Sequence, residues 1–167
     1  MLEIGNRAPE FTLAAQDGRD LSLTSFLNRG PLLLYFYPAD FTPICTRQAT
    51  AISGIHGELA HAGIHVAGIS PQSADSHRRF QAQHHLRQTL LADPEHTVTR
   101  MYDARGPMGI GIRRATYLID QGMVIRGIHV ADYRTLSPIG FMLESIPLMK
   151  AVRLQLQQLA EAAAAAA

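Results

Sequence analysis

Cys45 is the only cysteine in this sequence of 167 residues, and it closes the segment Pro38-Ala-Asp-Phe-Thr-Pro-Ile-Cys45. An apolar, strand-like run at residues 32–37 precedes the segment, and a helical pattern that ends at Gly63 follows it. The thiol is therefore expected in the first turn of a helix, at the carboxyl end of a buried strand. Unpaired backbone N–H groups and the helix dipole favour a thiolate there, and the thiolate is the reactive form of cysteine.

The residues just before Cys45 predict how that helix begins. Thr42 is a favoured N-cap residue, and Pro43 suits the first helical position, where a missing N–H costs nothing. Cys45 is then the third helical residue, the position that holds an anionic side chain in a capping box. The Thr42 hydroxyl is expected within reach of the same sulfur. The alternative is an ordinary small buried cysteine, but Cys45 does not stand within an apolar stripe.

The segment around Cys45 resembles a known active-site signature. Its pattern Pro38-x-x-x-Thr42-x-x-Cys45 is similar to that of peroxiredoxins, which are thiol peroxidases with a thioredoxin-like fold. Residues 36–46 resemble the branch called bacterioferritin-comigratory proteins, or Q-type peroxiredoxins. Three further segments resemble that branch in the same order, namely residues 5–13, 68–80 and 114–120. Four ordered matches, spread over residues 4–130, are far more specific than a single motif.

The resemblance implies an activity and a set of site residues. The activity is reduction of hydrogen peroxide and organic hydroperoxides through a sulfenic acid at Cys45. The resemblance assigns catalytic roles to Cys45, Thr42 and Arg114, and it places Pro38 and Gln48 in the substrate pocket. The substrate is then a hydroperoxide, and no cofactor is expected.

Two adjacent arginines open the strand that is predicted at residues 115–119. Because side chains alternate across a strand, only one of Arg113 and Arg114 can enter the site. The family pattern selects Arg114, two residues before Thr116. A guanidinium suits the site because it stays charged and offers its donors in a fixed fork. The alternative is that both arginines are solvated at a strand edge.

The sequence departs from the branch at two positions. A resolving cysteine often stands five residues after the peroxidatic one, where this chain has Thr50, and the family usually has glutamate where this chain has Gln48. With one cysteine, no intrachain disulfide can form. The expected partner is therefore an external thiol reductant, namely thioredoxin, glutaredoxin or glutathione. The protein is expected to act as a monomer or a homodimer.

Two other functions are alternatives to a peroxidase. A protein of the same fold could use oxidation of Cys45 as a signal, as a thiol-based redox sensor or binding module. A Cys-His hydrolase is the second alternative, although the sequence places no histidine to act as its base. Peroxide consumption with a thiol reductant separates a peroxidase from a sensor.

Length and composition indicate one globular domain. The chain is 47% hydrophobic and 17% charged, and its net charge of +1 gives no attraction to nucleic acid or to an anionic membrane. Residues 1–161 are expected to form a single thioredoxin-like domain, followed by a poly-alanine tail at residues 162–167. A single cysteine, no evident signal peptide and no apolar run of about 18 residues predict a cytoplasmic protein without a membrane span.

The order of elements predicts an α/β, thioredoxin-like fold with a central mixed β-sheet flanked by helices. A parallel βαβ unit comes first, and an antiparallel hairpin around Asp120-Gln-Gly122 follows. The helix that carries the thiol is expected to bury Ile44, Ile52, Ile55 and Leu59 on one face. The main expected strands are residues 32–37, 64–69, 89–92, 115–119 and 123–129, and the main expected helices are residues 43–63, 75–86, 94–102 and 137–160, the last interrupted by Pro147.

The eight histidines do not predict a metal site. His61 and His65 are four residues apart, but a helix-ending glycine lies between them. His84 and His85 are adjacent and point apart on a helix. Neither spacing is that of a metal-binding motif.

Residues 139–149 form an unusually apolar segment. We expect this segment to be a helix packed on its own sheet. A dimer interface and a lid over the site are the alternatives, because exposed apolar surfaces of this size often bind something. The segment is too short to span a bilayer.

Overall fold

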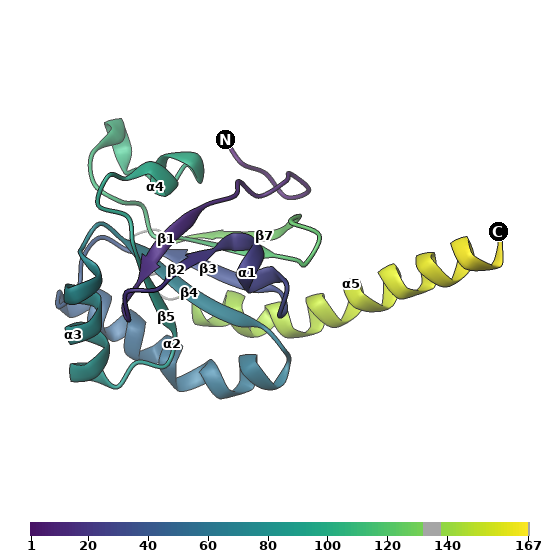
Figure 1. Ribbon diagram of the computed structural model, residues 1–167, viewed down its shortest axis with the longest axis horizontal. Helices are drawn as coiled ribbons and strands as arrows, with labels where there is room; N and C mark the ends of the chain where they lie inside the picture. Colours follow the sequence, from purple (N-terminus) through teal and green to yellow (C-terminus); the bar gives the residue numbers. More distant parts are fainter. Residues whose placement is uncertain (132–137, 167) are drawn as a thin grey trace.

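The computed structural model describes residues 1–131 and 138–166 (Figure 1). The strands are β1 (Thr12–Ala15), β2 (Asp20–Ser22), β3 (Leu32–Phe36), β4 (His65–Ser70), β5 (Thr89–Ala92), β6 (Ala115–Ile119) and β7 (Ile125–Val130). The helices are α1 (Leu23–Leu27), α2 (Pro43–His61), α3 (Ala74–His84), α4 (Thr97–Met101) and α5 (Ile139–Ala165), with a 3-10 turn η1 (Pro107–Gly109). In this described part of the chain, no helix is long and apolar enough to cross a membrane.

Within the described residues, seven strands form one sheet in the order β2-β1-β5-β4-β3-β6-β7. The central strands β5, β4 and β3 run parallel to one another. The outer strands β1, β2, β6 and β7 pair antiparallel with their neighbours. The predicted mixed sheet is therefore confirmed, and the strands predicted at residues 89–92 and 115–119 coincide with β5 and β6.

Helix α2 begins and ends where the sequence predicts. Pro43 occupies its first turn, and Gly63 has a φ of +74° just beyond its C-terminal end. That left-handed conformation suits glycine, which has no Cβ to clash. One packing prediction is wrong: Ile44 is 40% exposed, because Cys45, one residue further round the helix, takes the position that faces the sheet. The buried residues of α2 are Cys45, Gln48, Ala49, Ile52 and Leu59.

The hairpin predicted after β6 is present, and a buried carboxylate organises its turn. Asp120 is 3% exposed and accepts hydrogen bonds from the backbone N–H groups of Gly122, at 2.9 Å, and Val124, at 3.0 Å. Arg126 Nε also donates to this carboxylate, at 2.6 Å. The strand after the turn begins two residues later than predicted, because Met123 has a φ of +62° and belongs to the turn.

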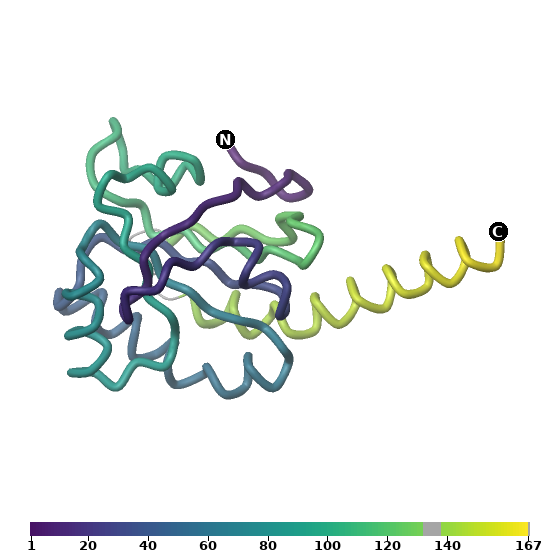
Figure 2. Tube along the Cα trace, viewed as in Figure 1, coloured from purple at the N-terminus to yellow at the C-terminus, as the bar shows by residue number. Residues whose placement is uncertain are grey.

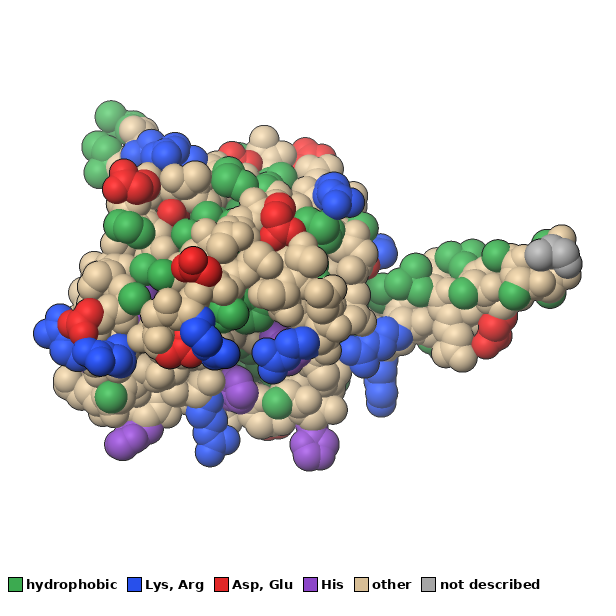
Figure 3. Space-filling view, viewed as in Figure 1, with side chains coloured by type: hydrophobic (Ala, Val, Ile, Leu, Met, Phe, Trp, Pro, Cys, Tyr) green, Lys and Arg blue, Asp and Glu red, His purple; other side chains and the backbone are tan. Residues whose placement is uncertain are grey.

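Helix α5 is continuous, so the predicted interruption at Pro147 is wrong. Pro147 lies on an exposed side of the helix, where water can bind the carbonyl group that proline leaves without a donor. Met142 and Met149 are buried against α2, which confirms that residues 139–149 pack on the domain's own core. Val152 still packs on this core, and the C-terminal part of the helix projects from the body (Figure 2), with apolar side chains along it (Figure 3). Residue 137, the predicted start, lies outside the described residues.

Helices cover both faces of the sheet, and β3 shows the consequence for the sequence. All five of its residues are buried. Leu33 and Tyr35 face the cluster that includes α2 and α5, whereas Leu34 and Phe36 face the opposite cluster. A strand covered on both faces needs a continuous apolar run, which is what residues 32–37 supply.

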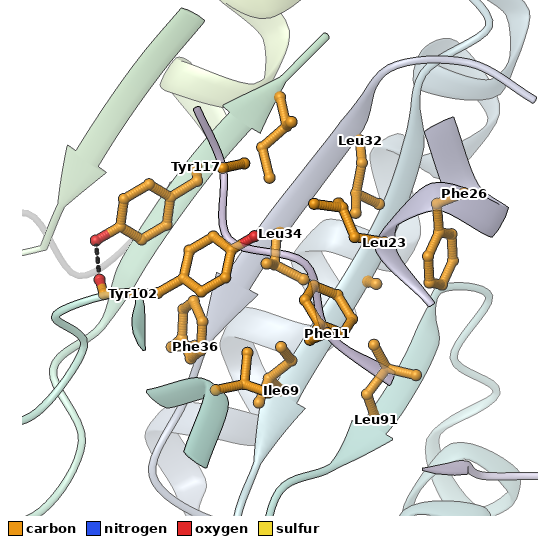
Figure 4. Close-up of a cluster of buried hydrophobic side chains, with 14 of the residues drawn as sticks. Phe11, Leu23, Phe26, Leu32, Leu34, Phe36, Ile69, Leu91, Tyr102 and Tyr117 are labelled. Atoms are coloured by element: carbon orange, nitrogen blue, oxygen red, sulfur yellow. Dashed lines mark hydrogen bonds between the residues drawn. The ribbon is translucent and has the colours of Figure 1, made fainter. Parts of the chain in front are cut away.

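The cluster on the face away from α2 is rich in aromatic side chains (Figure 4). Phe36, Tyr102 and Tyr117 pack with ring centroids 5.4–6.1 Å apart. The Tyr117 hydroxyl donates to the Tyr102 carbonyl, and the Tyr102 hydroxyl donates to the Pro9 carbonyl at 2.7 Å. Both buried phenols are thus paired, as burial requires. This packing holds β6 in place, and the predicted Arg114 immediately precedes that strand.

Candidate active site

Two strands bring the predicted site residues together. From the end of β3 the chain passes through residues 37–42 into α2, so Cys45 lies at the edge formed by the carboxyl ends of the parallel strands. Strand β6 runs antiparallel to β3, with Thr116 opposite Tyr35, so β6 begins at the same edge. Arg114 stands just before β6 and therefore meets a thiol that is 69 positions away in the sequence.

Cys45, Arg114 and Gln48 form the centre of the site. Cys45 is 2% exposed, and Arg114 Nη2 donates to its sulfur across 3.0 Å. Arg114 Nη1 donates to Gln48 Oε1 at 2.5 Å, and Gln48 is itself buried. The neutral amide fixes the guanidinium fork without neutralising it. The full positive charge of the arginine therefore faces the sulfur.

Arg113 lies on the other face of the sheet, as strand alternation predicts. It borders a small surface pocket together with Asp103 and Arg105, and it also contributes to the wall of a larger pocket beside Arg114. Burial raises the pKa of Tyr117 to about 12, and the nearby charge of Arg113 opposes that rise. Tyr117 belongs to the aromatic cluster on the face away from α2. The structure therefore brings Arg114, and not Arg113, to the thiol.

Thr42 is the N-cap residue of α2, but its hydroxyl does not cap the helix. The hydroxyl donates to the Ala39 carbonyl at 3.4 Å, within the loop that leads into the helix. The predicted N-cap position of Thr42 is therefore confirmed, although its side chain makes no hydrogen bond to the helix. Among the described residues, no hydrogen bond joins Thr42 to Cys45. Thr42 is exposed, so its hydroxyl can turn toward a molecule bound at the mouth of the site.

A pocket of about 500 Å³ lies beside the arginine. Pro38 forms part of its wall together with Arg114. The rest of the wall comes from the loop between α4 and β6 and from the end of β7, and its apolar side chains include Pro107, Ile110, Ile112 and Val130. Gln48, which was also predicted to line a substrate pocket, is buried and accepts the hydrogen bond from the guanidinium.

The wall behind the thiol carries two neutral phenol groups. Cys45 belongs to the same buried cluster as Tyr35 and Tyr37, whose rings stack with centroids 5.6 Å apart. Gln88 Nε2 donates to the Tyr35 hydroxyl at 3.2 Å. Burial raises the pKa of both tyrosines well above its usual value, so both remain protonated. On this side the sulfur faces a buried, largely aromatic wall, so the attraction of the arginine is weakly screened.

The loop at residues 37–42 also holds a buried network that the sequence analysis missed. Asp40 is 7% exposed, and His77, on α3, is fully buried. His77 Nδ1 lies 2.8 Å from Asp40 Oδ2, and Nε2 lies 3.1 Å from the Leu91 carbonyl oxygen. Asp40 and His77 both lie in segments that resemble the peroxiredoxin branch, and this resemblance was the only sequence signal that could have pointed to them. The sequence did not indicate that they are buried, because aspartate is normally exposed.

The model of the AhpC/TSA family matches residues 4–128 of the chain. The chain belongs to the AhpC/TSA family. It is 38% identical over 133 residues to peroxiredoxin bcp from Coxiella burnetii, a match that covers 76% of this chain and 87% of the relative. It is 39% identical over 137 residues to the chloroplastic peroxiredoxin Q of Oryza sativa subsp. japonica, covering 81% of this chain and 63% of the relative. The crystal structure of peroxidoxin BcpB from Mycobacterium tuberculosis matches with a TM-score of 0.81 at 25% identity, covering 89% of this chain and 98% of that one.

These similarities confirm three expectations from the sequence. The resemblance to peroxiredoxins of the bcp and Q types is correct, the fold is that of its solved AhpC/TSA relatives, and the enzyme class is that of thiol-dependent peroxidases. The single cysteine of this AhpC/TSA member fits a branch member that lacks a resolving cysteine. Thr50 stands five residues after Cys45, where the branch often has its resolving cysteine. It is exposed on α2, and its hydroxyl donates to the Thr46 carbonyl at 2.8 Å.

Proposed function

We propose that this chain reduces hydrogen peroxide and organic hydroperoxides through a sulfenic acid at Cys45. The observation that carries the proposal is the 3.0 Å contact between Arg114 Nη2 and the buried sulfur, next to an apolar pocket. A guanidinium at this distance favours the thiolate and can hold a peroxide oxygen beside it. Membership of the AhpC/TSA family supports the same chemistry.

The proposed reaction needs no cofactor to balance. The Cys45 thiolate attacks the terminal oxygen of the hydroperoxide, an S–O bond forms as the O–O bond breaks, and the sulfur becomes a sulfenic acid. The departing oxygen leaves with the electron pair of the broken bond and takes up a proton from solvent. The product is water from hydrogen peroxide, or an alcohol from an organic hydroperoxide.

Forming the thiolate supplies only a small part of the rate that such a reaction needs. An unperturbed thiol, with a pKa of ~8.5, is already a few per cent ionised at pH 7. Complete ionisation therefore gains about 30-fold, or ~2 kcal/mol of barrier. The rest must come from aligning the O–O bond with the sulfur and from stabilising charge on the departing oxygen. We assign this task to Arg114, to the backbone N–H of Cys45 and to the Thr42 hydroxyl.

The shape of the pocket supports organic hydroperoxides as substrates. Its wall is largely apolar, with Pro38, Ile110 and Val130 among its residues. An alkyl group can pack against this wall and so be removed from water, while the peroxide end of the same molecule contacts Arg114. Pro38 shields the thiolate from water, and Gln48 holds the guanidinium in place.

A second step must return the sulfenic acid to the thiol. The chain contains no second cysteine, so an outside thiol must attack the sulfur of Cys45, releasing water and forming a mixed disulfide. Another thiol then displaces Cys45 from that disulfide. We propose thioredoxin, glutaredoxin or glutathione as the source, and the cytoplasm, where such thiols are kept reduced, as the location. The active form is a monomer or a homodimer.

Peroxide consumption with each reductant supplied separately tests the proposed function. Hydrogen peroxide and cumene hydroperoxide are each mixed with the protein and with thioredoxin, glutaredoxin or glutathione, every one coupled to its own reductase. Turnover is expected with at least one reductant. Intact-mass spectrometry without reductant is expected to show addition of oxygen to the chain. Oxidation of Cys45 without turnover under any reductant would instead favour the thiol sensor.

Thr42→Val is expected to slow oxidation of Cys45 by at least ~10-fold, because valine keeps the branched shape but cannot donate to the departing oxygen. Thr42→Ser keeps the hydroxyl and is expected to be nearly silent. Because the chain contains no tryptophan, the rate is best followed by quenched-flow sampling and mass spectrometry. A large loss in Thr42→Ser would show that packing, and not the hydroxyl, matters at this position.

A further inference from the structure

Both ring nitrogens of His77 face hydrogen-bond acceptors. Nδ1 lies against the Asp40 carboxylate, and Nε2 lies against the Leu91 carbonyl. A single N–H on the ring can serve only one of these acceptors, so satisfying both contacts takes one more proton, shared between the ring and the carboxyl group. The side chains of His77 and Asp40 are 0% and 1% exposed. Polar groups buried to this degree persist only when they are paired.

Asp40 braces the loop at residues 37–42 internally and connects it to α3 and to the turn after β4. Its carboxylate accepts hydrogen bonds from the hydroxyls of Tyr37, just after β3, and Ser76, on α3, each at 2.7 Å. Its backbone N–H donates to Gln72 Oε1 at 2.8 Å, in the turn after β4. Burial alone would raise the pKa of Asp40, but the hydrogen bond and charge of His77, together with the two hydroxyls, outweigh burial and lower it.

The residue after Asp40 attaches the loop to the same helix. Phe41 has a φ of +63°, which phenylalanine rarely adopts, and its ring packs edge-on against Phe80 of α3 with centroids 5.2 Å apart. Thr42 follows as the N-cap residue of α2, and Cys45 lies in the first turn. Only that turn separates the anchored loop from the sulfur, so displacing the loop displaces the sulfur.

From these contacts we propose that Asp40 and His77 are positioning residues for Cys45. The pair holds the loop at residues 37–42 against α3, and the loop holds the first turn of α2 where the sulfur meets Arg114. Neither residue touches the sulfur. The inference rests on the proposed function, because it concerns the reaction of Cys45 with peroxide. A misplacement of about 1 Å can slow a reaction ~100-fold, so loosening the loop lowers reactivity without removing a reacting group.

Asp40→Asn tests this role, because the amide has the shape of the carboxylate but no charge to pair with His77. Two rates are measured on the reduced protein: single-turnover oxidation by hydrogen peroxide and alkylation by iodoacetamide, both at Cys45. Oxidation is expected to slow by at least ~10-fold, because the sulfur and Arg114 lose their alignment. Alkylation is expected to accelerate by at least ~3-fold, because a sulfur that is now buried becomes accessible. A purely structural role moves neither rate in the folded protein.

His77→Asn is the second variant, and it decides the question if Asp40→Asn does not fold. Its amide keeps one N–H toward the carboxylate in place of Nδ1, while the contact of Nε2 with the Leu91 carbonyl is lost. Both rates are expected to change in the same directions as in Asp40→Asn, by smaller factors. Unchanged rates in a folded His77→Asn protein would count against the proposal.

Asp120→Asn is the matched control. It breaks a buried carboxylate–arginine pair, 2.6 Å from Arg126 Nε, at the end of β6 opposite to Arg114. It is expected to lower thermal stability while both Cys45 rates stay within ~2-fold of the parent's, since distant sites act independently.

The proposal is overturned if Asp40→Asn leaves both rates within ~2-fold of the parent's, slows both together, or is reproduced by Asp120→Asn. A different result separates this proposal from the proposed function. If the parent protein does not react with peroxide but alkylation still accelerates in Asp40→Asn, the peroxidase assignment fails. The role of Asp40 and His77 in holding the loop at residues 37–42 is then still supported.

Discussion

Replacing Cys45 with serine is expected to abolish peroxide reduction, the largest effect of any single substitution in this chain. Serine is close to cysteine in size, and its hydroxyl can still accept the hydrogen bond from Arg114. An alcohol is not ionised near neutral pH and cannot form a sulfenic acid, so the chemical step is lost while the fold is kept. Peroxide consumption with a reductant measures the loss, and circular dichroism verifies the fold.

Thr50→Ser is the matched control for this experiment. It changes one exposed residue of the same helix, keeps the hydroxyl that donates to the Thr46 carbonyl and leaves the sulfur in place. Its peroxide consumption is expected to equal that of the parent protein. The Cys45→Ser protein contains no cysteine at all, so turnover that persists in it would end the peroxidase assignment.

Arg114→Ala is expected to slow oxidation of Cys45 by at least ~100-fold, in line with the removal of a charged donor from a transition state. The substitution removes the hydrogen bond to the sulfur and leaves Gln48 Oε1 without the arginine as its donor. Single-turnover oxidation by hydrogen peroxide is the direct measurement, because it excludes the recycling step. Arg114→Lys keeps the charge but cannot bond both partners with a fixed fork, so an intermediate rate is expected.

Arg113→Ala controls for the loss of one positive charge at this end of β6. Arg113 lies near Tyr117 and also contributes to the pocket wall, but Arg114 is the arginine that contacts the sulfur. Removal of Arg113 is therefore expected to change the rate of oxidation by hydrogen peroxide by only a small factor. A loss in Arg113→Ala that equals or exceeds the loss in Arg114→Ala would show that the register described for β6 does not hold in solution.

Much of the fold follows from local patterns in the sequence. The apolar run that forms β3 and the glycine that ends α2 are local signals, and both predicted the observed structure. The errors at Ile44 and Pro147 share a different cause. Each depends on which side of a helix meets the rest of the protein, and Ile44 differs from the buried Cys45 by a single helical position. Over so short a stretch, periodicity does not fix that orientation.

The centre of the site was predictable, whereas its surroundings were not. The motif identified Cys45, and alternation along a strand selected Arg114. Thr42 is the N-cap residue that the sequence predicted, but its hydroxyl bonds an acceptor in the loop, the Ala39 carbonyl, which the sequence did not indicate. The pairing of Asp40 with His77 joins residues 37 positions apart. It requires both side chains to be buried, which is decided only when α3 packs on the assembled sheet.

The antiparallel pairing of β3 with β6 constrains how the length of this sequence can change. If one residue were deleted from the start of β6 while its later residues kept their partners, Arg113 would take the place of Arg114, so an arginine would still face the thiol. Arg114 would then take the place of Ala115, which is 1% exposed and lies in the aromatic cluster. A guanidinium buried there without a partner would destabilise the sheet. Insertions and deletions should therefore cost the fold more within β6 than in the loop before Arg113, where they would change the pocket wall and leave the sheet in register.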